Sequence, residues 1–286
     1  MFGTQEPFTY FECASCGCLQ LVSVPDDMTR FYGRGYYSLG AAAWNGNSSL
    51  RKLTSKCSLL GIPGPSLFRR ILRSNDRHLQ ALGRLRIDRR MRILDVGCGS
   101  GELLFLLREL GYRAEGIDPF ISGEVVDSFG VRVRPVHLDQ VDGAWDLIMF
   151  HHSLEHMPDH RAVLQLVRER LVPKGRCLVR IPIAEEAWRR FGVDWVQLDA
   201  PRHLILHTLR SFKVLAEQCG FQVKDAYCDS EGQQFWRSEL YRRNVPVAER
   251  SAEKFSRWQR LGFKVHAAIL NMRRIGDQAV FVLQPS

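Results

Sequence analysis

The sequence predicts an α/β protein built on a doubly wound parallel sheet, and two patterns support this. From about residue 91 onward, short apolar runs alternate with amphipathic stretches at helical spacing. The first of these runs ends in a glycine-rich turn that leads directly into a helical pattern. A hydrophobic content of 45% and a charged content of 25% exclude a disordered or fibrous chain. No run of apolar residues is long enough to predict a transmembrane helix.

The chain divides into three predicted segments. Residues 1–60 are rich in glycine, serine and aromatic residues and predict an irregular arm or lid. Residues 61–90 predict a basic helical segment, because apolar residues recur at helical spacing and arginines fill the other face. Residues 91–286 predict the ligand-binding domain, with a helical insertion at about 235–274 before the last strand.

Within this domain the elements follow in a regular order. Right-handed crossovers between parallel strands place the carboxyl ends of the strands along one ligand-binding edge. Helices are expected at 102–110, 161–171 and 209–219, after an earlier one at 67–85. Strands are expected at 92–96, 112–118, 131–136, 145–150, 176–181, 221–227 and 279–283.

The glycine turn is the strongest local signal. Asp95-Val-Gly-Cys-Gly-Ser-Gly101 lies between a strand and a helix, where backbone N–H groups can approach a ligand closely. Glu102 stands where the dinucleotide fingerprint requires its third glycine. Asp118 ends the second strand, where a carboxylate can accept both hydroxyls of a ribose. Together these residues predict a nucleoside-containing ligand.

Three motifs carry a family resemblance. They are Ile93-Leu-Asp-Val-Gly-Cys-Gly-Ser-Gly101, Asp146-Leu-Ile-Met-Phe-His-His-Ser-Leu-Glu-His-Met157 and Val172-Pro-Lys-Gly-Arg176. In this order and spacing, over residues 91–230, the chain resembles the class I S-adenosylmethionine-dependent methyltransferases. The resemblance implies a Rossmann-like sheet of seven strands with the last strand antiparallel. It also implies S-adenosylmethionine as the cofactor of the domain at residues 91–286.

The resemblance also implies positions for the cofactor. Gly97, Gly99 and Gly101 would pass under its amino-acid moiety, with Asp95 nearby. Asp118 would hold the ribose. The segment at 137–139, which includes Leu138 and Asp139, would flank the adenine.

A narrower likeness lies outside the sheet. The Cys13-x2-Cys16 pair, the Phe31-Tyr-Gly-x3-Tyr37 stretch and the Trp195-x5-Pro-Arg-His203 loop resemble a bacterial subgroup. Its members methylate sugars, polysaccharide precursors or secondary metabolites, and some carry a zinc-ribbon-like arm with two cysteine pairs. The acceptors that this likeness implies are small molecules, nucleotide sugars or glycans.

The cysteines leave two readings of the arm open. Cys13, Cys16 and Cys18 have the spacing of half a zinc ribbon, whereas a closed zinc site takes four ligands. Cys57 is the nearest other candidate, so a zinc site and a metal-free loop remain alternatives, and we favour the loop. Scattered cysteines without a secretion signal favour reduced thiols and a cytoplasmic location.

Methyl transfer to a hydroxyl, or to a carbon acidified by a carbonyl, needs a base as well as alignment of the reactants. Histidine is suited to this role because its pKa lies near neutrality. His152, after the fourth strand, and His203, in the loop after the fifth, are the candidate bases. For Glu155-His156 we favour structural or cofactor-side packing. The expected acceptor contacts are Trp195, Arg202, Tyr36 and Tyr37.

The formal charge of +9 is concentrated in two segments. Residues 67–92 hold nine arginines against two aspartates, and residues 237–274 hold ten Lys and Arg against three glutamates. The second segment is amphipathic, so it could face an anionic membrane or a phosphate-bearing substrate, although a solvated helix face is the simpler reading. A nucleic-acid methyltransferase is an alternative, disfavoured because no Asn/Asp-Pro-Pro-Tyr motif is present. A non-catalytic cofactor-binding protein is another.

Overall fold

The computed structural model describes residues 6–32, 54–56, 58–59, 76–126, 132–245 and 251–286. Tyr36, Tyr37, Cys57 and the first part of the helix predicted at 67–85 lie outside the described residues. The remainder of that helix is α3 (Arg77–Leu85), which begins at Asp76, whose carboxylate accepts from the backbone N–H groups of His78 and Leu79.

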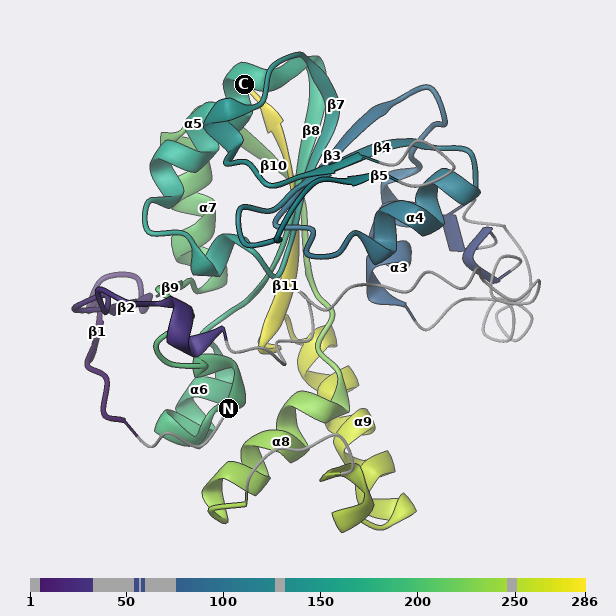
Figure 1. Cartoon of the computed structure of the whole chain (residues 1–286). Helices are drawn as coiled ribbons and strands as arrows, with labels where there is room; N and C mark the ends of the chain where they lie inside the picture. Colours follow the sequence, from purple (N-terminus) through teal and green to yellow (C-terminus); the bar gives the residue numbers. More distant parts are fainter. Residues whose placement is uncertain (1–5, 33–53, 57, 60–75, 127–131, 246–250) are drawn as a thin grey trace.

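The core of the molecule is an eight-stranded sheet in the order β10-β11-β8-β7-β3-β4-β6-β5 (Figure 1). Neighbours among β8, β7, β3, β4 and β6 are parallel, whereas β11 runs antiparallel to both β8 and β10. The predicted antiparallel last strand is therefore confirmed. The strands are β3 (Arg92–Val96), β4 (Arg113–Ile117), β5 (Val125–Val126), β6 (Arg132–Arg134), β7 (Trp145–His151), β8 (Leu171–Pro182), β10 (Phe221–Cys228) and β11 (Gln278–Pro285).

Two details of the sheet differ from the prediction. The eighth strand is the two-residue β5, which pairs antiparallel with β6 at the sheet edge and is too short to give a sequence pattern. β8 begins at Leu171, five residues before the predicted start, because Leu171 already pairs with Trp145 of β7. A register shift follows in β7, so the segment 173–175 is an irregular part of the strand and not a turn before it.

Helices cover both faces of the sheet, as Figure 1 shows. Side chains of β7 alternate between the two layers: Leu147 and Met149 pack with α3 and α4, and Ile148 and Phe150 pack with α5 and α7. Nearly all the residues of this strand are buried, as expected for a central parallel strand. The helices are α4 (Glu102–Glu109), α5 (His160–Arg170), α6 (Glu186–Phe191), α7 (Leu209–Gln218), α8 (Gly232–Arg242) and α9 (Arg257–Met272).

The N-terminal arm contains regular structure where an irregular segment was predicted. β1 (Tyr10–Glu12) and β2 (Leu19–Leu21) form a hairpin, and β2 also pairs with β9 (Ile205–Leu206). Leu19 and Leu21 are buried, and the residue between them is exposed. This alternation covers only three residues, which is too short to be recognised in the sequence. The hairpin thus attaches the arm to the loop that follows β8.

The helical insertion between β10 and β11 forms a hairpin of α8 and α9, which projects away from the sheet (Figure 1). The two helices approach closely, because a Cβ at Gly232 would lie 2.8 Å from the backbone nitrogen of Lys264. Among the described residues, no helix is long and apolar enough to cross a membrane.

Candidate active site

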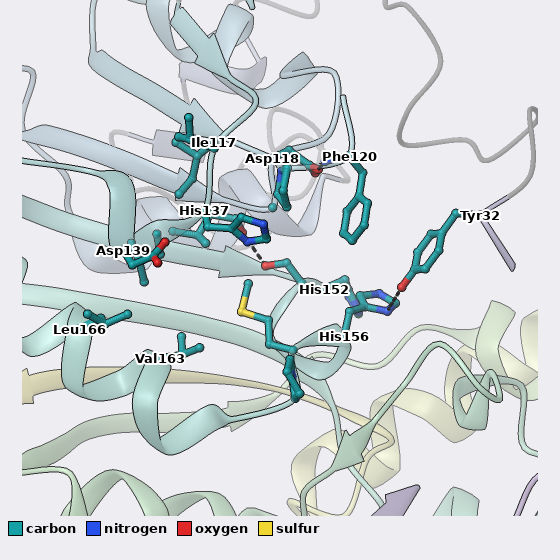
Figure 2. Close-up of a pocket in the computed structure, with 18 residues that line it drawn as sticks. Tyr32, Ile117, Asp118, Phe120, His137, Asp139, His152, His156, Val163 and Leu166 are labelled. Carbon is teal, nitrogen blue, oxygen red and sulfur yellow. Dashed lines mark hydrogen bonds between the residues drawn. The ribbon is translucent and has the colours of Figure 1, made fainter. Parts of the chain in front are cut away.

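A pocket of about 370 Å³ opens at the carboxyl ends of β3, β4 and β7, the edge at which ligands were expected (Figure 2). One side consists of the residues that follow β3 and β4, and the other consists of residues that follow β7 and the first turns of α5. The pocket therefore lies between the glycine turn and the predicted base. Its lining residues include Gly97, Asp118, Leu138, Asp139 and His152.

The glycine turn requires its glycines for conformation and for space. Gly97, Gly99 and Gly101 all have positive φ, which side chains other than glycine rarely adopt. A Cβ at Gly97 would lie only 2.4 Å from Cβ of Ser153, on the opposite side of the pocket. Ser153 is fixed in turn by a hydrogen bond from its Oγ to the carbonyl oxygen of Val96, 2.5 Å long. A side chain at Gly97 would therefore displace both the turn and the segment that contains Ser153.

Asp118 is held in the pocket by backbone hydrogen bonds. Its Oδ2 accepts from Gly99 N–H at 2.9 Å and its Oδ1 accepts from Phe120 N–H at 2.9 Å. These bonds connect the end of β4 to the glycine turn and fix the orientation of the carboxylate. Each oxygen retains a lone pair, so the group can still accept hydroxyl donors from a ribose.

Asp95 lies behind the turn, outside the pocket lining. It is buried, and its Oδ1 has no hydrogen-bond partner among the residues that the structure describes. Burial, with a further contribution from the neighbouring Asp118 charge, raises the pKa of Asp95 to about 8. A buried, unpartnered acid beside a glycine turn is suited to a ligand with a positive charge. S-Adenosylmethionine carries an ammonium and a sulfonium, so the residues present fit the cofactor implied by the resemblance.

The part of the pocket beyond Asp118 is largely apolar, which suits a flat base. Leu138 and Asp139 lie here, on the short 3₁₀ helix Leu138–Gln140. Phe120 was missed by the sequence reasoning: it directly follows the ribose-side segment, and its ring stacks on Tyr32 with centroids 5.4 Å apart. The other apolar lining residues are Ile117, Val136, Met157, Pro158, Val163 and Leu166.

His152 lies opposite Asp118 across the pocket (Figure 2). It directly follows β7 with a positive φ, and its backbone N–H donates to the carbonyl oxygen of Arg180. Its side chain keeps 28% of its surface exposed, and its Nδ1 lies 3.3 Å from Oε1 of Glu155. Burial lowers the pKa of His152, the charge of Arg180 lowers it further, and Glu155 opposes both. The imidazole is therefore neutral at neutral pH, the form that can accept a proton.

Glu155 is the acidic centre of a histidine cluster. Its side chain is buried, and Nε2 of His203 lies 4.0 Å from its Oε1. Burial alone would raise the pKa of Glu155, but the nearby imidazoles of His152, His156 and His203 lower it to about 2. Glu155 is thus an anion that orients His152 and favours its protonated form, a role beyond the packing expected from the sequence.

The remaining predicted residues lie near this cluster but outside the pocket lining. His203 is buried, its Nδ1 lies 2.7 Å from the carbonyl oxygen of Gln197, and its ring contacts that of His156. Arg202 is also buried and is paired with Asp199. Both residues lie behind His156, which does line the pocket and which was not among the predicted bases.

Trp195, expected to contact the acceptor, belongs instead to the core. Its side chain is fully buried in a cluster with Leu19, Phe191 and Phe235. Its indole N–H donates to Oδ2 of Asp277 at 3.4 Å. The large apolar side chain fills the space between the arm, α6 and α8. A sequence pattern does not distinguish a tryptophan with this packing role from one that contacts a ligand.

Two clusters have the spacing to hold a metal ion among the described residues. Their possible ligand atoms all lie within 4.8 Å of one another in each cluster. In the arm no fourth histidine, cysteine or acid from the described residues joins the three thiols, which agrees with an incomplete zinc site. The predicted absence of a metal stays a prediction. The clusters are Cys13, Cys16 and Cys18, and Glu155, His156 and His203.

Comparison with protein families gives a match to the methyltransferase domain over residues 67–226, more than half of the chain. The chain is also similar to ubiquinone biosynthesis O-methyltransferases. It is 28% identical to that of Idiomarina loihiensis over 30% of this chain and 40% of the relative. It is 24% identical to that of Bradyrhizobium diazoefficiens over 51% of this chain and 65% of the relative. The matched segments thus span less than two thirds of these relatives.

Solved structures also match the chain, at low sequence identity. A cyclopropane synthase from Mycobacterium tuberculosis has a TM-score of 0.46 at 16% identity, covering 84% of this chain and 99% of that one. An S-adenosylmethionine-dependent methyltransferase from Archaeoglobus fulgidus has a TM-score of 0.42 at 18% identity, covering 68% and 85%.

Proposed function

The chain belongs to the methyltransferase domain family, and from this premise we propose that it transfers a methyl group from S-adenosylmethionine to a hydroxyl of a small-molecule acceptor. His152 is the proposed base. The observation that carries the proposal is the shared pocket: Gly97 of the glycine turn and Asp118 line one side of it, and His152 lines the other.

The cofactor supplies an activated methyl group, so the chain itself has two tasks: to align the acceptor and to remove its proton. Gly97 and Asp118 would hold the cofactor on its side of the pocket. His152 would accept the hydroxyl proton at Nε2, because its Nδ1 lies only 3.3 Å from Oε1 of Glu155. The imidazolium that results is stabilised by the negative charge of Glu155.

The basicity of His152 favours one class of hydroxyl. Its pKa is lowered, so it is a weaker base than an ordinary histidine. A phenol, with a pKa of about 10, loses its proton to such a base far more readily than the alcohol of a sugar does. The relatives named above are O-methyltransferases of ubiquinone biosynthesis, which also supports a hydroxyl acceptor. We therefore propose a phenolic acceptor.

A glycan or nucleotide-sugar acceptor is the second candidate. It is favoured by the cysteine-containing arm, which resembles that of sugar methyltransferases and which pairs with β9 beside the site. Such an acceptor would approach the pocket from the side of the loop that follows β8.

The test is transfer of a labelled methyl group from S-adenosylmethionine to a panel of catechols, other phenols, nucleotide sugars and short RNA. We expect product with phenols, and loss of product in His152→Gln. Product with nucleotide sugars alone would support the second candidate, and product with RNA would support the nucleic-acid alternative. Cofactor binding without product from any acceptor would indicate a non-catalytic binding protein.

A further inference from the structure

The outer face of α9 (Arg257–Met272) carries an apolar stripe that no described part of the chain covers. Its residues are spaced by three and four positions, so they lie along one face of the helix. Trp258 is 81% exposed and Met272 is 77% exposed, at opposite ends of the helix. The stripe consists of Trp258, Leu261, Val265, Ile269 and Met272, all of them exposed.

This stripe is not the face by which α9 packs onto the molecule. The packed face is formed by Phe263, Ala267 and Leu270, which join a cluster that also contains Phe235 of α8. α9 therefore has two apolar faces, one satisfied by the fold and one directed outward. Single exposed apolar residues are ordinary on a soluble protein, but a continuous stripe of five marks an interaction surface.

The charged residues of α9 itself are of one sign. α9 contains no aspartate or glutamate, whereas Arg257, Arg260 and Lys264 lie on it and Arg273 and Arg274 follow it directly. Arg257, Lys264, Arg273 and Arg274 are exposed, and none of these five forms an ion pair with any described residue. An apolar face with a tryptophan at one end and cationic margins is complementary to an anionic lipid surface, which offers both acyl chains and phosphates.

We propose that α9 docks the protein on the surface of a bilayer that contains anionic phospholipids. The helix lies in the plane of the interface, with the stripe among the acyl chains and the cationic side chains at the phosphates. The α8–α9 hairpin projects from the sheet (Figure 1), and the stripe on its outer face is exposed among the residues that the structure describes. The proposal depends only on this hairpin and stands whether or not the pocket transfers methyl groups.

Vesicle flotation tests the proposal with the full chain. Vesicles of equal parts phosphatidylglycerol and phosphatidylcholine should carry the protein, and vesicles of phosphatidylcholine alone should carry much less. Binding should weaken at high salt, because the phosphate contacts are screened. The fluorescence emission of Trp258 should shift to shorter wavelength on binding. In Trp258→Phe, which keeps an apolar ring, this shift should disappear while flotation persists.

Two double variants separate the apolar and the ionic contributions. Trp258→Ser with Met272→Ser should weaken binding by on the order of tenfold, because both side chains would otherwise enter the interface. Arg257→Gln with Lys264→Gln should weaken it by about 30-fold, because each cation near such a surface contributes about 1 kcal/mol. The matched control, Arg113→Gln with Lys174→Gln, removes two exposed cations at the amino edge of the sheet and should bind as wild type does.

Three results would overturn the proposal. Equal flotation with both kinds of vesicle would show that binding does not require anionic lipid. A concentration-dependent dimer, observed by sedimentation without lipid and abolished by Trp258→Ser with Met272→Ser, would assign the stripe to a second copy of the chain. RNA binding that depends on Arg257 and Lys264 but not on Trp258, with no flotation, would assign the charges to nucleic acid. All the variants change exposed side chains, so unchanged thermal unfolding confirms that each remains folded.

Discussion

The two sides of the pocket are built in different ways. The cofactor side consists of the glycine turn and Asp118, which end adjacent strands and are joined by a backbone-to-carboxylate hydrogen bond. The acceptor side gathers groups from distant segments: Tyr32 of the arm lies 3.2 Å from Nδ1 of His156, and Glu155 lies beside His203 of the loop after β8. The first side depends on local backbone conformation, and the second depends on tertiary packing.

The electrostatics of the two sides also differ. On the proposed cofactor side, burial raises the pKa of Asp95, whose Oδ1 has no hydrogen-bond partner among the described residues. On the acceptor side, burial lowers the pKa values of His152 and His156 and leaves neutral imidazoles around the Glu155 anion. Cofactor binding and proton transfer should therefore respond to different substitutions, because each depends on its own set of groups. Four predictions follow this separation, from the largest effect to the smallest.

Replacement of the proposed base should affect turnover alone. We expect His152→Gln to reduce kcat by roughly 10²–10⁴-fold, the usual contribution of a general base. Its cofactor affinity should change little, because Asp118 and the glycine turn remain intact. Steady-state kinetics and calorimetric titration measure the two quantities. His266→Gln, which replaces a histidine of α9, is the matched control. An unchanged kcat in His152→Gln would refute the base assignment.

Replacement of the first turn glycine should affect binding. In Gly97→Ala the added Cβ would meet Ser153, and the positive φ would be strained. Together these costs amount to about 3 kcal/mol, so cofactor affinity should fall by about 100-fold. Gly123→Ala is the control, because nothing lies within 4 Å of a Cβ at that position. Wild-type affinity in Gly97→Ala would show that the cofactor does not bind at this turn.

Removal of the Glu155 charge should shift the pH dependence of kcat. Neutral His152 is the active form, so activity is lost as the pH falls through the pKa of His152, which burial places below 6.5. Glu155 raises that pKa, so in Glu155→Gln the acid limb of kcat should shift to lower pH while kcat itself falls by about tenfold. A shift to higher pH, or an unmoved limb, would contradict the pairing of these two residues.

A buried histidine pair below the site should weaken the fold in acid. His160 Nδ1 lies 2.9 Å from His207 Nε2, and burial lowers the pKa of His160 to about 4. The unfolded chain, with a histidine pKa near 6.5, then binds more protons between these values, so stability is full above about pH 6.5 and falls toward pH 4. Urea unfolding should show a loss of about 2 kcal/mol from His160 between about pH 7 and pH 5. His160→Gln should flatten this dependence, and an equally steep dependence in the variant would exclude His160 as its source.

Residues that the sequence predicted for the cofactor side, Gly97, Asp118, Leu138 and Asp139, line one pocket in the structure, and the reason is local. A positive φ at Gly97 and an acid at the end of β4 are properties of short segments, so motif and spacing are enough to place them. β3 was predicted for the same reason: it was placed at its observed bounds from five residues of apolar pattern.

The acceptor side could be predicted only in outline. His152 could be placed because it directly follows a strand, whereas the role of Glu155 depends on histidines brought together by the loop after β8. Trp195 was predicted to contact the acceptor and instead belongs to the hydrophobic core. Its neighbours come from the arm and from α8. Such contacts leave no periodic signal in the sequence.

The most direct test of the account is a calorimetric titration of S-adenosylmethionine into wild type, Asp118→Ala and His152→Gln. The account predicts binding to wild type, affinity weaker by roughly 10- to 100-fold in Asp118→Ala because hydrogen bonds to a charged group are lost, and nearly wild-type affinity in His152→Gln. No binding to wild type, or equal affinity in wild type and Asp118→Ala, would contradict the assignment of this pocket to the cofactor.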